Sequence, residues 1–100
     1  MLNQVVLVGR LSHDLEIKEI EGNKKGLDIV LAVPRSFKNS DGLYDTDFIN
    51  CKVYADMASN VVEYCKKGDL LGVRGRLQVV DNTMVVIAER VTFLSSKSSN

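Results

Sequence analysis

The chain has 100 residues, of which 45% are apolar and 26% charged, and thirteen basic residues balance thirteen acidic ones. This length and composition fit one compact globular domain and leave little room for a second. The net charge of zero removes the simplest argument for a nucleic-acid or membrane partner, a strongly basic composition. No apolar run approaches the roughly 20 residues that span a bilayer, so we expect a soluble, cytoplasmic protein with no membrane partner.

The first predicted element is a strand over residues 3–11. Its β-branched and apolar residues occupy both faces of the pleat, a pattern typical of strands that are covered on both sides. In a domain this small, the second cover could be another subunit, and we therefore predict a homo-oligomer. Gly9 suggests a bulge or bend of the kind that lets a strand curl around a barrel.

A polar edge strand, a buried strand and a hairpin tip follow. Residues 14–21 hold four acids, which favours an edge strand that leads into a polar turn at 22–26. Residues 27–33 predict a buried strand, and Pro34 should end its regular pairing because proline has no N–H to donate. The polar segment 38–42 contains Asp-Gly between apolar runs and predicts the tip of a hairpin.

The most informative predicted strand covers residues 48–54, which alternate with a period of two. One face fits a core: Ile49, Cys51 and Val53. The other face alternates rings with polar groups: Phe48, Asn50, Lys52 and Tyr54. Single strands of nucleic acid are held by rings on which bases stack and by cations that follow the phosphates, and this face supplies both. The alternative is that the two rings pack under a loop or against a second subunit.

Further rings and cations come from the neighbouring segments. The predicted hairpin adds four residues: Arg35, Phe37, Lys38 and Tyr44. On a strand predicted over residues 70–80, Arg74 and Arg76 share one face and could reach consecutive phosphates or stack on bases. The alternative for these arginines is a solvated sheet face paired with nearby acids. The acids cluster at 14–21 and are absent from both of these faces, so we expect a local excess of positive charge there.

One helix is predicted between these strands. Apolar residues recur at helical spacing from Ala58 to Cys65, and Asp56 is a candidate N-cap. Lys66 and Lys67 would lie in the last turn, with Gly68 just past the end.

The order of the elements predicts an all-β fold with one helix. Strands over 70–80 and 84–94 are separated by so few residues that a tight hairpin must join them. The helix then lies between the third and fourth strands of a five-stranded set, which is the arrangement of an OB-fold barrel. A β-sandwich is the alternative, but a lone helix before a closing hairpin fits it less well. We predict one OB-fold domain over residues 1–94 and a disordered polar tail over 95–100.

The residue types and their spacing give little support for catalysis or metal binding. His13 is the only histidine, and no serine or cysteine lies in a motif that would make it part of a nucleophilic site. Cys51 and Cys65 lack the spacing of a zinc or redox site, so we expect two reduced and largely buried thiols.

Four blocks of the sequence resemble the bacterial and phage single-stranded DNA-binding protein family: LNQVVLVGRL at 2–11, DFINC at 47–51, NVVEYCKKG at 60–68 and GVRGRLQ at 72–78. The resemblance runs from about residue 2 to residue 94 in the same order and spacing. It implies an OB-fold that assembles, usually as a homotetramer, and binds single-stranded DNA with little sequence preference. The cellular contexts implied are DNA replication, repair, recombination or uptake, near the nucleoid. The resemblance also implies no enzymatic activity, no metal and no cofactor.

The resemblance extends to the site residues. Those that match the base-stacking aromatics of the family are Phe37, Phe48 and Tyr54. We expect phosphates to be neutralised by Arg10, Arg35, Lys52, Arg74 and Arg76, with Lys38 and Tyr44 beside them. The alternative function is that of an OB-fold protein-interaction subunit in a replication-restart or other assembly.

Two features depart from the pattern of the family. The connection at residues 81–83 is much shorter than the long hairpin loop that the family usually carries, which affects the extent of the DNA footprint. The acidic, hydrophobic tip through which the family recruits replication and repair enzymes does not appear in the 100 residues. We therefore expect either a truncated chain or a short form, and no such recruitment by these residues.

Overall fold

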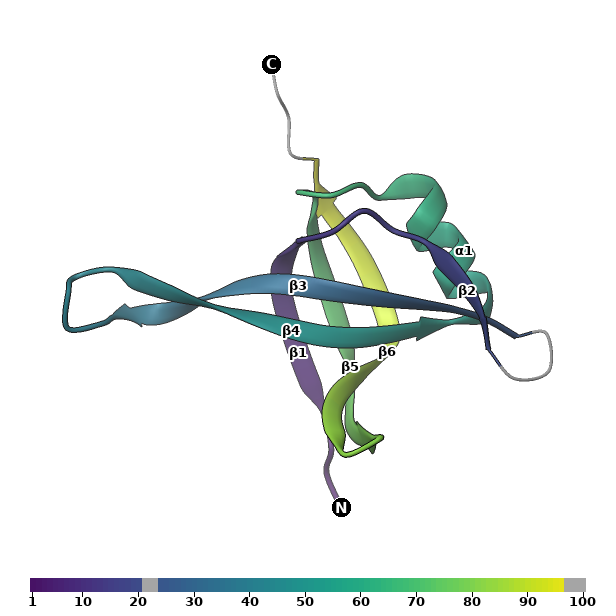
Figure 1. Cartoon of the computed structure of the whole chain (residues 1–100), viewed down its shortest axis with the longest axis horizontal. Coiled ribbons are helices and arrows are strands. Elements are labelled where there is room, and N and C mark those ends of the chain that lie inside the picture. Colours follow the sequence, from purple (N-terminus) through teal and green to yellow (C-terminus); the bar gives the residue numbers. More distant parts are fainter. Residues whose placement is uncertain (21–23, 97–100) are drawn as a thin grey trace.

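The computed structural model describes residues 1–20 and 24–96, which form six strands and one helix. In chain order these are β1 (Val5–Leu11), β2 (Ile17–Ile20), β3 (Lys24–Lys38), β4 (Tyr44–Tyr54), α1 (Ala55–Tyr64), β5 (Leu70–Val80) and β6 (Thr83–Ser95). Five strands close a barrel in the order β1-β5-β6-β4-β3, because β3 pairs back onto β1 (Figure 1). The remaining strand, β2, pairs with the outer edge of β3. Since α1 lies between the third and fourth barrel strands, the predicted barrel with one helix is confirmed.

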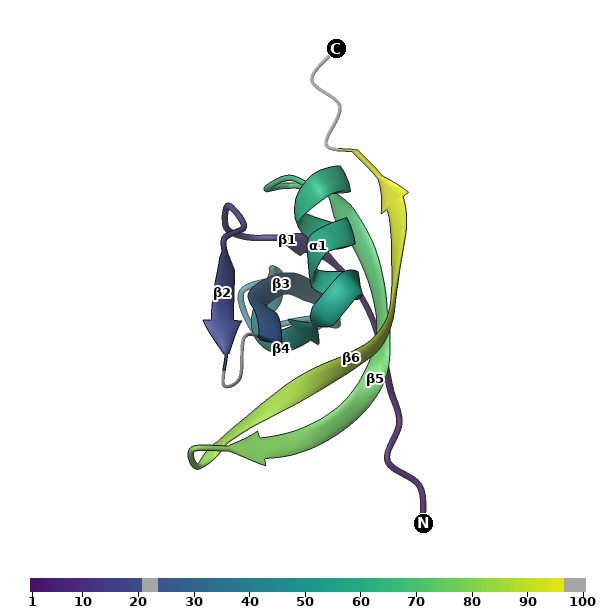
Figure 2. The same ribbon diagram turned by 90° about the vertical axis from the view of Figure 1, so that its right-hand side faces the viewer.

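One face of β3 and one face of β4 fill the barrel, as the period of two predicts. Along β3, Leu27, Ile29 and Leu31 are buried, and they pair in register with Val53, Cys51 and Ile49 of β4. The buried face of α1, which includes Ala58 and Val61, belongs to the same core cluster and packs mainly against β3 and β4 (Figure 2). The packed core beneath β4 therefore holds the outward-facing residues of this strand in place.

Two glycines permit close contacts between strands. A Cβ at Gly75 would lie 2.0 Å from the carbonyl oxygen of Ile87, and the β5–β6 register shifts between Arg74 and Gly75. Gly75 thus occupies a β-bulge, as a barrel bend requires. A Cβ at Gly9 would lie 2.8 Å from the carbonyl oxygen of Ala32. The β1–β5 register runs evenly through Gly9, so the bend predicted there is a close crossing of β3 rather than a bulge.

The hairpin of β3 and β4 extends well beyond the barrel (Figure 1). We call residues 34–47 of this hairpin the arm. The regular pairing ends at Pro34 as predicted, because the register shifts between Pro34, which pairs with Thr46, and Lys38, which pairs with Tyr44. The strand itself nevertheless continues to Lys38. A two-stranded arm leaves one side of each strand without a neighbouring strand, which is where a residue without an N–H is tolerated.

The elements before the arm begin and end at residues other than those predicted. Lys24, Lys25 and Gly26 were expected in a turn but begin β3, where Gly26 pairs with Lys18 of β2 on one side and with Tyr54 of β4 on the other. Of the predicted edge strand 14–21, Ile17–Ile20 form β2 and residues 14–16 precede it. Residues 21–23 of the predicted strand and turn lie outside the described residues, as do residues 97–100 of the predicted tail, whereas Ser95 ends β6.

The ends of α1 differ from the prediction. Tyr54 occupies the N-cap position without a side-chain hydrogen bond, and Asp56 lies inside the first turn, where its charge favours the helix dipole without capping it. The helix ends at Tyr64, so Lys66 and Lys67 lie beyond the last turn. The carboxylate of Asp69 accepts a hydrogen bond from the backbone N–H of Lys66 at 2.9 Å and fixes the turn that follows. No helix in the described part of the chain is long and apolar enough to cross a bilayer.

Both cysteines are free and buried, as predicted. Burial raises the pKa of the Cys51 thiol to about 11, and burial together with the charge of Asp69 raises the pKa of Cys65. Neither thiol is therefore a reactive thiolate at neutral pH.

Candidate nucleic-acid interface

The outer face of β4 carries the predicted row of alternating side chains, which we call the aromatic row: Phe48, Asn50, Lys52 and Tyr54. Phe48 is 64% exposed and Tyr54 is 38% exposed, whereas Cys51 and Val53 between them are buried. The alternation predicted for this strand is therefore confirmed. Among the described residues, no loop covers the two rings.

Small residues lie opposite both rings. In the β3–β4 register, Ala32 pairs with Phe48 and Gly26 pairs with Tyr54. Cross-strand neighbours on the same face are the groups that would otherwise pack against a ring. Since glycine has no side chain and alanine only a methyl group, β3 leaves the ring faces of the aromatic row open.

The strand-to-helix corner holds Tyr54 at the end of the row. Ala55, the next residue, has φ 58°, a left-handed conformation that is unusual for a residue with a Cβ. The chain therefore turns sharply after Tyr54 and enters α1 directly. The ring position is fixed by a strand on one side and by a helix on the other.

Lys52 lies between the two rings but is not a free cation. Its ammonium Nζ is 2.9 Å from Oδ1 of Asp28, the residue directly opposite on β3. The hydrogen bond from Lys52 to Asp28 raises the pKa of Lys52, with smaller contributions from the charges of Tyr54 and Asp81. The expectation of a face without acids is wrong here, because β3 brings a carboxylate that the β4 sequence does not contain.

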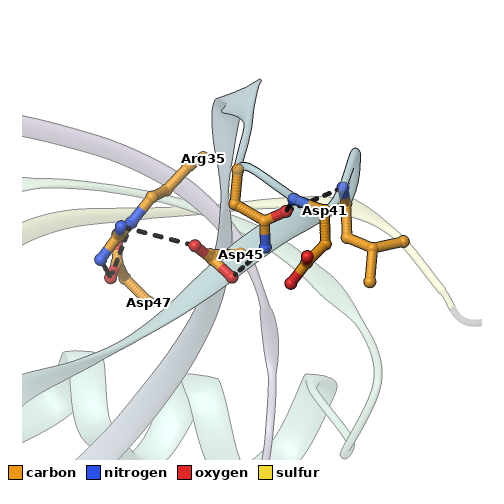
Figure 3. Close-up of polar contacts among 6 residues, drawn as sticks. Arg35, Asp41, Asp45 and Asp47 are labelled. Carbon is orange, nitrogen blue, oxygen red and sulfur yellow. Dashed lines mark hydrogen bonds and ion pairs between the residues drawn. The ribbon is translucent and has the colours of Figure 1, made fainter.

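The arm holds Arg35 between two carboxylates (Figure 3). Its guanidinium donates to both oxygens of Asp47, at 2.9 and 3.1 Å, and lies 3.7 Å from Asp45. This pairing raises the pKa of Arg35 and lowers the pKa of Asp47, in both cases mainly through their hydrogen bonds. Because successive residues of a strand point to opposite faces, Asp47 and its arginine lie on the face of β4 opposite Phe48.

The tip of the arm is ordered by one side chain. The side-chain oxygen of Asn39 accepts hydrogen bonds from the backbone N–H groups of Asp41 and Leu43, and its amide nitrogen donates to Asp45 (Figure 3). Near this turn, Lys38 lies 5.8 Å from the centre of the Tyr44 ring, within the range of a cation–π contact. The arm therefore presents Tyr44 and Phe37, both more than half exposed, on a braced hairpin.

Arg74 and Arg76 are both exposed on β5, on either side of the buried Gly75. Arg76 pairs in register with Ile87 of β6, which also pairs with Lys52 of β4, so Arg76 and the aromatic row lie two strands apart. Its guanidinium contacts Glu89 at 3.3 Å. Arg74 instead pairs with Arg90 of β6 and with Val6 of β1.

Arg10, Lys38 and Arg74 differ from the other predicted cations. Arg10, on β1, donates to the backbone carbonyl of Gly68 at 3.0 Å. Within residues 1–20 and 24–96, no ion pair involves Arg10, Lys38 or Arg74, whereas Arg35 has two and Lys52 and Arg76 have one each. Half of the six predicted cations therefore already contact a carboxylate.

A family model described as the single-strand binding protein family matches residues 2–94, nearly the whole chain. The chain belongs to this family. It is 39% identical to single-stranded DNA-binding protein B of Bacillus subtilis, over 97% of this chain and 94% of that protein. It is 44% identical to a single-stranded DNA-binding protein of Halalkalibacterium halodurans, over 99% of this chain but only 64% of that protein.

The structural comparison agrees with the family assignment. The fold matches the crystal structure of the single-stranded DNA-binding protein from Thermus aquaticus with a TM-score of 0.77 and 26% identity. The match covers 99% of this chain and 43% of that one, so this chain spans less than half of the Thermus protein. The predicted resemblance to the family is confirmed.

One feature near the site follows from the local sequence, and two others depend on how the strands pair. The connection between β5 and β6 is a tight turn in which Asp81 and Asn82 have φ 50° and 64°, as hairpin turns of this type require. Its shortness was predicted from the sequence. The open ring faces opposite Gly26 and Ala32, and the pairing of Lys52 with Asp28, were not predicted, because they depend on the β3–β4 register.

Proposed function

We propose that this chain binds and coats single-stranded DNA with little sequence preference. Bases stack on Phe48 and Tyr54 of the aromatic row and on Phe37 of the arm, and the cations around them contact phosphates. The observation that carries the proposal is the pair of exposed rings on one strand face with only Gly26 and Ala32 opposite them. Aromatic rings accept every base, which makes such binding tolerant of sequence.

The same surface supports a non-enzymatic function. Its exposed groups are rings, an amide and ion-paired charges, and none of the described histidine, cysteine or acidic side chains gather in a group of three that could hold a metal ion. We propose that the protein keeps DNA strands unpaired in the cytoplasm, at the nucleoid, during replication, repair, recombination or uptake. It needs no cofactor to do so.

An equilibrium titration with DNA tests this function. Oligo-dT and a duplex of equal length are titrated separately into the protein, with fluorescence anisotropy as the readout. We expect at least tenfold tighter binding to the single strand, because the bases of a duplex are stacked on one another and unavailable to the rings. Binding to neither DNA would favour the protein-interaction alternative, and equal binding to both would contradict a stacking surface.

We further propose that the protein assembles as a homo-oligomer, most simply a tetramer. Val6 is 70% and Val8 49% exposed on the outer face of β1. Residues 5–9 of β1 pair with β5 along one edge, and among the described residues the pairing with β3 begins only at Arg10. An exposed apolar face beside a free strand edge favours association with another copy of the chain.

Light scattering at micromolar concentration tests the assembly. We expect the wild-type protein to have a mass several times 11.1 kDa, and the Val6→Asp/Val8→Asp variant to shift toward 11.1 kDa, because two charges would be buried at the interface. Val79→Asp is the matched control, since Val79 is a similarly exposed valine near the β5–β6 turn. A wild-type protein that is only monomeric would refute the assembly without affecting the DNA-binding proposal.

A further inference from the structure

A pocket of about 290 Å³, with both charged and apolar side chains in its lining, opens beside the middle of the aromatic row. From the barrel it is lined by Asp28, Asn50 and Lys52, and from the β5–β6 turn by Asp81 and Thr83. Asn50 and Lys52 are the two members of the row that lie between the rings. A DNA strand stacked on both rings therefore passes directly over this pocket.

Among the side chains that the structure describes in the lining of the pocket, the charged groups are two carboxylates and one ammonium. The ammonium of Lys52 is 2.9 Å from Asp28, and the charges of Asp28 and Asp81 both favour its protonated form. The Asp28 side chain is 53% exposed, whereas the Lys52 side chain is 24% exposed. A phosphate that approaches this lysine meets the carboxylate before it meets the cation.

A phosphate and a carboxylate bind an ammonium in the same way, through charge-assisted hydrogen bonds from its N–H groups. The two anions therefore compete for one cation, and each repels the other. In the folded protein Asp28 is held in place by the β3–β4 register, so it occupies the cation before DNA arrives. The DNA strand must displace this contact or bind beside it.

We propose that Asp28 limits the affinity for single-stranded DNA by competing with the DNA phosphates for Lys52, and that Asp81, which lines the same pocket, repels those phosphates. This inference rests on the proposed function. The strand is then held at this point by its bases, on Phe48 and Tyr54, rather than by its phosphates. When the strand leaves, the contact between Lys52 and Asp28 forms again.

Two single substitutions test the competition. Asp28→Asn and Asp81→Asn each remove a carboxylate with almost no change in size, and asparagine tolerates the φ of 50° at position 81. We expect each variant to bind oligo-dT about two- to fivefold more tightly at low salt, the range of one exposed charge interaction. The logarithm of affinity should also fall more steeply with the logarithm of salt, by about 0.7 for the phosphate gained.

Asp41→Asn is the matched control. It removes the same charge from the turn of the arm, where the side chain of Asp41 makes no ion pair among the residues that the structure describes. We expect its affinity to stay close to that of the wild type. An equal gain in this variant would overturn the proposal, because the effect would then come from the overall charge of the protein.

The role of Lys52 is tested by repeating Asp28→Asn in a Lys52→Gln background. We expect the gain to disappear there, because the cation for which the anions compete is gone. A gain that persists would overturn the proposal, and so would unchanged or weaker binding by both single variants with unaltered thermal unfolding. Weaker binding confined to oligo-dC would also overturn it and would assign the carboxylates to base edges. If the wild-type protein does not bind oligo-dT, the proposed function itself fails.

Discussion

Replacing Phe48 and Tyr54 together by alanine is expected to weaken the binding of oligo-dT at least tenfold while leaving the barrel folded. Each stacked base contributes about 1–3 kcal/mol, and a factor of ten in affinity corresponds to about 1.4 kcal/mol. The loss of both rings therefore suffices for a tenfold weaker affinity even if each ring contributes only about 1 kcal/mol. Both rings are exposed, so their removal leaves no cavity in the core.

The control for this double variant is Tyr64→Ala. Tyr64 is an exposed tyrosine near the end of α1 and lies outside the aromatic row. Its loss should leave the affinity within about twofold of the wild-type value, a difference of roughly 0.4 kcal/mol. Unfolding by heat and circular dichroism would report whether each variant is folded. A folded Phe48→Ala/Tyr54→Ala variant with undiminished affinity would exclude base stacking on this strand.

Gly75→Ala is expected to lower the free energy of unfolding by about 3 kcal/mol, the upper range for forcing additional atoms into a packed site. The added methyl group would lie 2.0 Å from the Ile87 carbonyl oxygen and 2.9 Å from its carbon, both backbone atoms that cannot rotate away. The bulge between β5 and β6 would have to open to admit it. Chemical denaturation followed by circular dichroism measures the change.

A second glycine on the same strand supplies the control. A Cβ at Gly72 would meet its nearest neighbour, a methyl group of Leu94, at an ordinary 3.7 Å. Gly72→Ala should therefore change the free energy of unfolding by less than about 1 kcal/mol, since it adds no clash and reduces the freedom of the unfolded chain. Equal effects of the two substitutions would show that the β5–β6 bulge does not depend on the missing side chain at position 75.

Local patterns predicted much of this architecture. The period of two over residues 48–54 predicted which side chains of β4 face outward, and the spacing of the last two strands predicted their tight turn. Both features depend on residues close together in the chain, where alternation and turn chemistry determine the result. The extent of β3 beyond Pro34 was not predictable in this way, because it depends on having no second neighbouring strand along the arm.

The charges of the site were the least predictable part. Lys52, Arg35 and Arg76 were each expected to be available to phosphates, and each contacts a carboxylate that comes from another strand. A sequence does not state which residue of one strand pairs with which residue of the next. Since a shift of one residue moves every side chain to the other face, the partner of a cation is known only when the register is known.

These ion pairs show how the net charge of zero affects the proposed site, because acids lie directly beside three of its cations. Phosphate contacts depend on salt, whereas base stacking depends on it far less. With three of the six predicted cations held by carboxylates, we expect about three phosphate contacts for each chain. We therefore expect stacking on exposed rings to supply the larger part of the affinity.

The titration of oligo-dT and of the matched duplex, repeated across a range of salt concentrations, tests this account most directly. Three contacts predict that the logarithm of single-strand affinity falls with the logarithm of salt by a slope of about 2 or less per protomer. The preference for the single strand should survive at high salt. A slope near 4, as expected if all six cations bound phosphates, together with loss of that preference at high salt, would contradict a surface that binds DNA mainly through its rings.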